Sequence, residues 1–252
     1  MVQEVVDKVN GGKKVIVGVS STSHLDVIEY AKHAKDVGAD AVLLVPPYYF
    51  RDDDEGLFTF IELVSNKIDL DIVLYNLPGP TKFNLTSSLL QKVLDRADNI
   101  VAVKDATKDM TQLIDTIRVI GARVPVIAGA EEIALFGLLS GSQGATSGMA
   151  NFAPEIPVSI YKAVQEGRLK DACSIFFEQM LRFRHLDVFG ILQGFPIQNV
   201  YIKEAMNLMK MSAGPVRPPL VPLSKEKVAQ LKVALEELHL ISVRNSMPVG
   251  QQ

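Results

Sequence analysis

The stretch that decides the fold is Ile100-Val101-Ala102-Val103-Lys104-Asp105-Ala106, in which four consecutive apolar residues end in a lysine. A short continuous apolar run is typical of a strand that is buried on both faces of a sheet. A lysine at the end of such a strand is costly unless its amine is paired or neutral, and desolvation favours the neutral form. A neutral amine can attack a carbonyl and form a Schiff base. The alternative is that Lys104 extends from the strand end into solvent.

Five further runs of the same kind predict a sheet around this strand. The run Ile72-Val73-Leu74 ends in Tyr75-Asn76, so a phenol is expected beside the amine. The expected strands, counting that of Lys104, are 14–19, 41–45, 71–75, 100–104, 125–128 and 144–147. Their starts lie 19–30 residues apart, which is the spacing of βα units and favours a parallel sheet.

Helical patterns fill the intervals between these runs. Leu57, Phe60, Ile61 and Val64 form an i, i+3, i+4, i+7 stripe after the capping candidates Asp53 and Asp54. Beyond Pro154 the sequence predicts helices only. These helices are expected near 156–166, 169–188, 197–210 and 225–238. We therefore expect a barrel portion over 1–154, a helical region over 155–240 and a loose tail over 241–252.

The number of strands leaves two architectures open. A closed (β/α)8 barrel needs eight strands, and this sequence offers six. The sheet is either open and doubly wound, or it belongs to a TIM barrel whose first two strands are not in this chain, followed by a C-terminal helical extension.

Composition excludes several classes of function. The chain has 252 residues, 48% of them hydrophobic, which is the size of one α/β barrel. Its net charge of -3 argues against nucleic-acid partners. Cys173 is the single cysteine, and the four histidines have no metal-ligand spacing. We expect no membrane-spanning segment and no secretion signal, and hence a cytoplasmic protein.

The carboxyl ends of the expected strands indicate the chemistry, because parallel α/β proteins gather their reactive groups there. Gly18-Val19-Ser20 after the first strand lacks the glycines of a dinucleotide loop, so an open-sheet dehydrogenase is a weak alternative. No carboxylate pair follows successive strands to hold a metal. A lysine, tyrosines and hydroxyls remain. That set suits amine catalysis on a carbonyl without a metal or an organic cofactor.

Several motifs give the chain a resemblance to a known family. They are Gly38-Ala39-Asp40-Ala41, Pro46-Pro47-Tyr48-Tyr49, Tyr75-Asn76-Leu77-Pro78, Lys104-Asp105-Ala106 and, late in the chain, Arg217-Pro218-Pro219-Leu220 with Pro222-Leu223-Ser224. In this order they resemble the dihydrodipicolinate synthase and N-acetylneuraminate lyase family, from about residue 5 to 240. That family comprises class I (Schiff-base) aldolases on a (β/α)8 barrel.

The resemblance assigns roles to individual residues. Lys104 would form an imine with pyruvate or another 2-oxo acid, and Tyr75 would relay protons. Tyr49 resembles a family tyrosine that crosses a dimer interface, which implies a homo-oligomer (a dimer or tetramer). Gly129 and Thr146 match positions that line the substrate pocket. Each of the last four has a purely structural alternative: aromatic packing for the tyrosines, and strand-end geometry for Gly129 and Thr146. Asp105 is expected to cap or pair locally.

Two departures from the family pattern bear on activity. The family's Gly-Thr-Thr-Gly-Glu motif, which holds the carboxylate of the 2-oxo acid, does not occur in this sequence. We therefore expect a fragment, a mis-assigned start or a chain of low stability. True dihydrodipicolinate synthases carry an arginine where this chain has Pro80, and proline cannot bind a carboxylate in a bidentate manner.

The function predicted from the sequence is thus a lyase or synthase that makes or breaks a C–C bond between a 2-oxo acid and an aldehyde. An aldolase acting on 2-keto-3-deoxy sugar acids is the first alternative. A truncated, catalytically silent member of the family is the alternative from another class.

Overall fold

A computed structural model describes residues 1–49, 53–185 and 198–241. The chain forms two compact units, Met1–Thr146 and Ser147–Gln252. Most of the expected tail, from residue 242 onward, lies outside the described residues. So do residues 186–188 and 197, at the ends of two expected helices.

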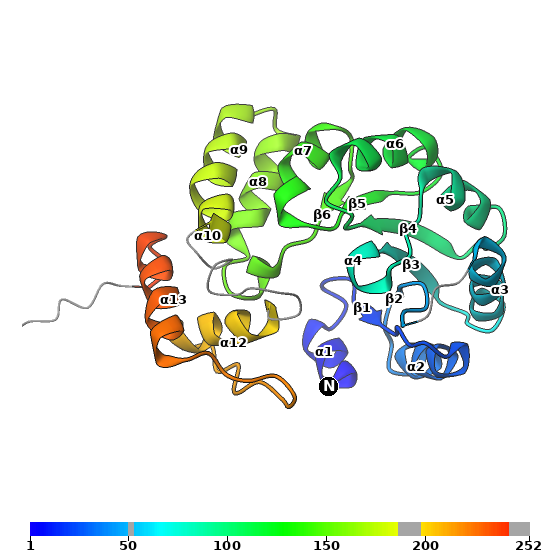
Figure 1. Ribbon diagram of the computed structural model, residues 1–252, viewed down its shortest axis with the longest axis horizontal. Coiled ribbons are helices and arrows are strands. Elements are labelled where there is room, and N and C mark those ends of the chain that lie inside the picture. The colour runs from blue at the N-terminus through cyan, green and yellow to red at the C-terminus, as the bar shows by residue number, and fades with distance from the viewer. Residues whose placement is uncertain (50–52, 186–197, 242–252) are drawn as a thin grey trace, which may run out of the picture. The chain divides into compact units, whose positions relative to one another are not determined.

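The first unit is built on a curled sheet of six parallel strands (Figure 1). The strands are β1 (Ile16–Gly18), β2 (Ala41–Leu44), β3 (Asp71–Asn76), β4 (Ile100–Asp105), β5 (Val126–Ala128) and β6 (Gly144–Ala145). Each strand pairs with the next one along the chain. All six expected strands are present, most of them shorter than predicted. A doubly wound sheet reverses its strand order at a switch point, so that alternative is wrong.

Helices follow the strands and cover one face of the sheet (Figure 1). They are α2 (His24–Asp36), α3 (Asp54–Ser65), α5 (Ser87–Leu94), α6 (Met110–Ile120) and α7 (Glu131–Leu139). Apart from this row, α1 (Val2–Val9) precedes β1 and the short α4 (Pro78–Thr81) follows β3. Helix α3 contacts α2 and α5, and α6 contacts α5 and α7. The expected cap of α3 is Asp53, whose carboxylate accepts a hydrogen bond from Gly56 N.

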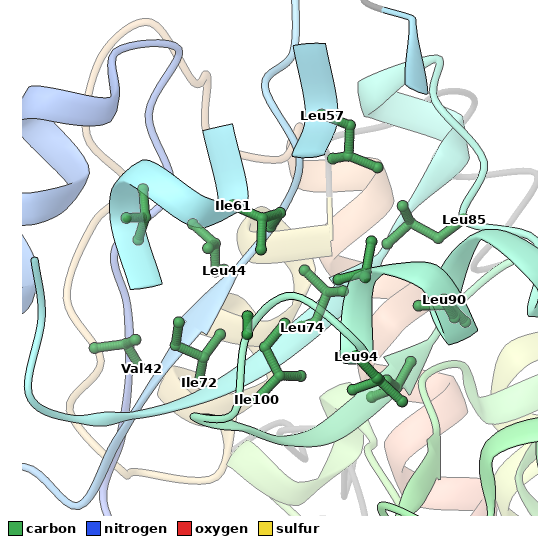
Figure 2. Packing of buried hydrophobic residues seen from close by; sticks show 14 of the residues in the cluster. Val42, Leu44, Leu57, Ile61, Ile72, Leu74, Leu85, Leu90, Leu94 and Ile100 are labelled. Carbon is green, nitrogen blue, oxygen red and sulfur yellow. The ribbon is translucent and has the colours of Figure 1, made fainter. Parts of the chain in front are cut away.

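The two faces of the sheet bury different side chains. Residues toward the helices form the main core, whose members in Figure 2 include Val42, Leu44, Leu57, Ile61, Ile72, Leu74, Leu85, Leu90, Leu94 and Ile100. A smaller cluster of Ala41, Val73 and Ala102 packs with Leu43 and Ile127. Side chains alternate along a strand. Tyr75 and Lys104, two residues beyond Val73 and Ala102, therefore lie on the face of this smaller cluster.

Asn99 fixes the amino end of β4. Its Nδ2 donates to the carbonyl oxygens of Ser65 (3.4 Å), Ile68 (3.5 Å) and Leu70 (3.3 Å), and its Oδ1 accepts from the Ser65 hydroxyl at 2.5 Å. These contacts join the turn before β3 to the start of β4. They hold β3 and β4 together where the strands enter the sheet, just before the register shift between Ile72 and Val73.

The second unit consists of helices among its described residues. They are the 3₁₀ turn η1 (Gly148–Asn151), α8 (Glu155–Gln165), α9 (Leu169–Ile175), the π-helical turn η2 (Phe176–Leu181), α10 (Arg182–His185), α12 (Gln198–Leu208) and α13 (Lys225–Glu237). Its interior includes an aromatic cluster, in which the ring of Phe183 lies 5.3 Å from that of Phe152 and 6.2 Å from that of Tyr201.

Candidate active site

The structure brings Lys104 and Tyr75 together at the carboxyl ends of β4 and β3. The two residues are register partners on neighbouring strands. The Lys104 Nζ lies 3.9 Å from the centroid of the Tyr75 ring. An ammonium over the face of an aromatic ring is attracted by the ring quadrupole, so the Tyr75 ring helps to position the Lys104 side chain.

Burial sets the protonation of both groups. It lowers the pKa of the Lys104 amine from 10.5 to about 8. It also raises the pKa of the Tyr75 phenol, which therefore stays protonated at neutral pH. Both shifts follow from the cost of taking a charged form out of water. The pair thus combines an amine that deprotonates easily with a phenol that can donate a proton.

The residues that follow this pair hold the ends of the two strands. Asn76 and Asp105 are register partners and are fully buried. The Asn76 side chain donates to the Leu85 carbonyl and accepts from the Leu85 N–H, both at 3.0 Å. The Asp105 Oδ1 accepts from the N–H and the hydroxyl of Thr107, at 2.9 and 2.6 Å. The expectation that Asp105 caps locally is confirmed.

Gly129 and Thr146 continue this row of strand ends. The N–H of Gly129 donates to the Asp105 carbonyl at 2.6 Å, and that of Thr146 donates to the Ala128 carbonyl at 2.9 Å. A Cβ at Gly129 would lie 2.7 Å from the Asp105 oxygen and 2.9 Å from the Ala106 Cβ. The absence of a side chain at Gly129 is therefore required by packing between β4 and β5.

Tyr49 lies on the loop after β2 and is 96% exposed. Its backbone is in the left-handed region, at φ 87°, which is rare for a residue with a side chain. Within one described chain the tyrosine is not part of the Lys104 and Tyr75 pair. Its role across an interface stays a prediction.

Two polar residues that support the site, Asn84 and Gln112, were not expected from the sequence. The Asn84 and Gln112 side chains exchange hydrogen bonds of 2.8 and 2.9 Å, and the Asn84 Oδ1 also accepts from Asn76 Nδ2 at 3.1 Å. These residues are far apart in the chain and have no motif in common. A hydrophilic residue on a loop and another on a helix do not reveal such a contact before the fold is known.

The described residues contain neither a cluster of metal ligands nor a membrane-spanning helix. Between residues 1–49, 53–185 and 198–241, no group of three or more histidine, cysteine, aspartate or glutamate side chains could hold a metal ion. None of the helices in the same ranges is long and apolar enough to cross a membrane.

Comparison with known proteins supplies the family. The model of the dihydrodipicolinate synthetase family matches residues 1–238. The chain belongs to this family. It is 32% identical to a 4-hydroxy-tetrahydrodipicolinate synthase of Methanococcus vannielii, over 96% of this chain and 80% of the relative. It is 31% identical to an uncharacterized DapA-like lyase of Pyrobaculum islandicum, over 95% of this chain and 81% of the relative.

A solved structure agrees with this assignment. The prophage protein YagE of Escherichia coli, solved in complex with pyruvate, is 31% identical and superposes with a TM-score of 0.86, over 95% of this chain and 80% of YagE. Members of the family are Schiff-base, pyruvate-dependent lyases and synthases. The family and the enzyme class predicted from the sequence are therefore confirmed.

The close contact at Gly129 gives a stability prediction. In Gly129→Ala the new methyl group overlaps the backbone of β4, and the free energy of unfolding is expected to fall by about 1–3 kcal/mol. Urea denaturation measures the change. Gly79→Ala is the control, because a Cβ there meets no atom within 4 Å and should leave the stability unchanged or slightly higher. Equal losses in both variants would contradict the packing argument.

Proposed function

We propose that this chain forms an imine between the Lys104 Nζ and the carbonyl carbon of pyruvate or a related 2-oxo acid, and that it makes or breaks a C–C bond beside that carbon. One observation carries the proposal. Lys104 has a half-buried amine of lowered pKa, set over the ring of Tyr75 on the neighbouring strand. The complex of the related YagE with pyruvate supports the choice of substrate.

The lowered pKa supplies the nucleophile. With a pKa of about 8, roughly one-tenth of the Lys104 amines are neutral at pH 7. At the ordinary value for lysine the fraction is below about one in a thousand. The neutral amine adds to the carbonyl carbon, and loss of water leaves a protonated imine. This cation draws electrons from the adjacent carbon, which can then lose a proton and attack an aldehyde.

Tyr75 is placed to move protons in these steps. Its phenol remains protonated at neutral pH, so it can donate a proton to the departing hydroxyl and later recover one. We assign Tyr49 to the same relay across a subunit interface, in keeping with its exposed position. Gly129 and Thr146 would lie along the substrate at the ends of β5 and β6. The homo-oligomer and the cytoplasmic location stay predictions.

We also propose that β1–β6 correspond to strands three to eight of the family's barrel, with a C-terminal helical extension in residues 155–240. The curled sheet with sequential parallel strands supports this correspondence.

The surroundings of Pro80 favour a sugar-acid substrate over the dihydrodipicolinate reaction. Pro80 is exposed on α4, the short helix that follows β3. The Thr81 hydroxyl donates to the Leu77 carbonyl at 2.8 Å, which fixes this helix next to the strand end. A proline there presents no donor to a second carboxylate. The acceptor aldehyde is therefore expected to carry hydroxyl groups, as in 2-keto-3-deoxy sugar acids.

Reductive trapping tests the proposed function. Pyruvate with borohydride should attach a stable label to the intact protein, and peptide mass spectrometry should place it on Lys104. Lys104→Arg keeps the positive charge but cannot form the imine, so it should remain unlabelled. A label on another lysine would overturn the assignment. No label on the folded wild type would favour the catalytically silent alternative.

A panel of aldehydes tests the substrate class. With pyruvate present, polyhydroxy aldehydes such as glyceraldehyde should be consumed at least about tenfold faster than aspartate semialdehyde, because Pro80 supplies no cation for a second carboxylate. Product formation is followed by chromatography. Pro80→Arg should reduce the ratio of the rate with glyceraldehyde to the rate with aspartate semialdehyde. Faster reaction of the wild type with aspartate semialdehyde would show that the chain performs the dihydrodipicolinate reaction.

A further inference from the structure

We propose that Asp105 is a positioning residue: its buried carboxyl holds the carboxyl end of β4 so that the Lys104 amine stays over the Tyr75 ring. The proposal rests on the proposed function of Lys104 and adds a residue that does not contact the substrate. Asp105 follows Lys104 directly, and its side chain lies on the opposite face of the sheet because side chains alternate along a strand.

The carboxyl of Asp105 organises the turn after the strand. Its Oδ1 binds both the N–H and the hydroxyl of Thr107. The Thr107 Oγ1 in turn accepts from the N–H of Asp109 at 3.3 Å. Asp109 then caps α6 through Thr111 N (2.8 Å) and Gln112 N (3.2 Å). One carboxylate thus starts the chain of contacts that leads from the lysine strand into the next helix.

These contacts return to the strand of Tyr75. On α6, Gln112 binds the side chain of Asn84 and the carbonyl of Leu85. Both groups are also held by Asn76, the residue after Tyr75. The carbonyl of Asn76 accepts from the N–H of Ala106 at 2.9 Å, so the series of hydrogen bonds that began at Asp105 returns to the residue after it. Tyr75 and Lys104 are therefore each followed by a residue of one continuous hydrogen-bonded ring.

The burial of Asp105 is costly, and no cation among the described residues offsets this cost. The residue is fully buried, and its Oδ2 has no hydrogen-bond partner among the described residues. Burial raises the pKa of the carboxyl, and the negative charge of Asp109 adds to this effect. Thr107 and the Asn76 amide act in the opposite direction. A buried polar group with an unused oxygen calls for an explanation, and a positional role supplies one.

Charge on Asp105 does not account for the lowered pKa of Lys104, because burial alone is the cause of that shift. The neighbours of Lys104 in the sheet are Tyr75 on β3 and the uncharged Ile127 on β5. The nearby cation Lys108 is paired with Glu132 at 3.0 Å. Asp105 therefore acts on the amine through geometry: it keeps the strand end closed and the amine out of water.

The test follows imine formation with pyruvate against pH, by borohydride trapping on the full chain. In the wild type the rate should rise with a midpoint near pH 8, as the amine deprotonates. Asp105→Ala opens the turn and admits water. Its midpoint should therefore move up by about one unit, and trapping at pH 7 should slow about tenfold. Asp105→Asn keeps an acceptor for Thr107 and should stay within about twofold of the wild type.

Two further variants separate positioning from loss of stability. Thr107→Val removes one of the two contacts to Asp105 and should raise the midpoint by a smaller amount, which keeps the test valid if Asp105→Ala does not fold. Asn99→Ala removes the hydrogen bonds that hold the amino end of β4 to the turn before β3. It should lower the melting temperature and leave the midpoint near pH 8. If Lys104 is labelled in the wild type but the pH midpoint of trapping is the same in Asp105→Ala and Asn99→Ala, this inference is wrong and the proposed function stands. Failure to label the wild type would overturn the proposed function itself.

Discussion

The desolvation of one amine is the constraint on which the rest of the site depends. Lys104 ends an otherwise apolar strand, and burial brings the pKa of its amine down to about 8. The ring of Tyr75 favours the ammonium, whereas burial favours the neutral amine, so this amine is stable in place and still able to deprotonate. The strand partners of Lys104, Tyr75 and Ile127, supply no countercharge, which would raise the pKa of the amine again.

The fold supplies that enclosure through the alternation of its strands. On β3 and β4, Leu74 and Val103 pack under the helices and contribute to the hydrophobic stabilisation of the sheet. Val73 and Ala102, one position earlier on each strand, line the other face, two residues before Tyr75 and Lys104. The same register therefore positions the core on one side and the reactive pair on the other. Asn76 and Asp105 then lock the strand ends from the side of the helices.

Much of this arrangement could be predicted from the sequence, and the part that could not has a physical reason. Apolar runs ending in Tyr75 and Lys104 predicted the strands and the reactive pair, because a strand buried on both faces appears in the sequence as a continuous apolar run. The choice between a doubly wound sheet and a barrel-type sheet needed the strand pairing itself. The hydrogen bonds between Asn84 and Gln112 join positions distant in the chain, and such side-chain pairs have no local signature in the sequence. The early end of β6 within the expected strand 144–147, and the π-helical turn η2 inside the expected helix 169–188, likewise have no local signature in the sequence.

The pKa of Lys104 in the folded protein tests the central claim most directly. Lysine labelled with ¹³C at the ε position can be titrated by NMR, and the signal absent from Lys104→Arg identifies the residue. The account predicts a midpoint near pH 8 for this signal, well below the ordinary value for lysine. A midpoint near the ordinary lysine value of 10.5 would show that the amine is solvated and would contradict the account.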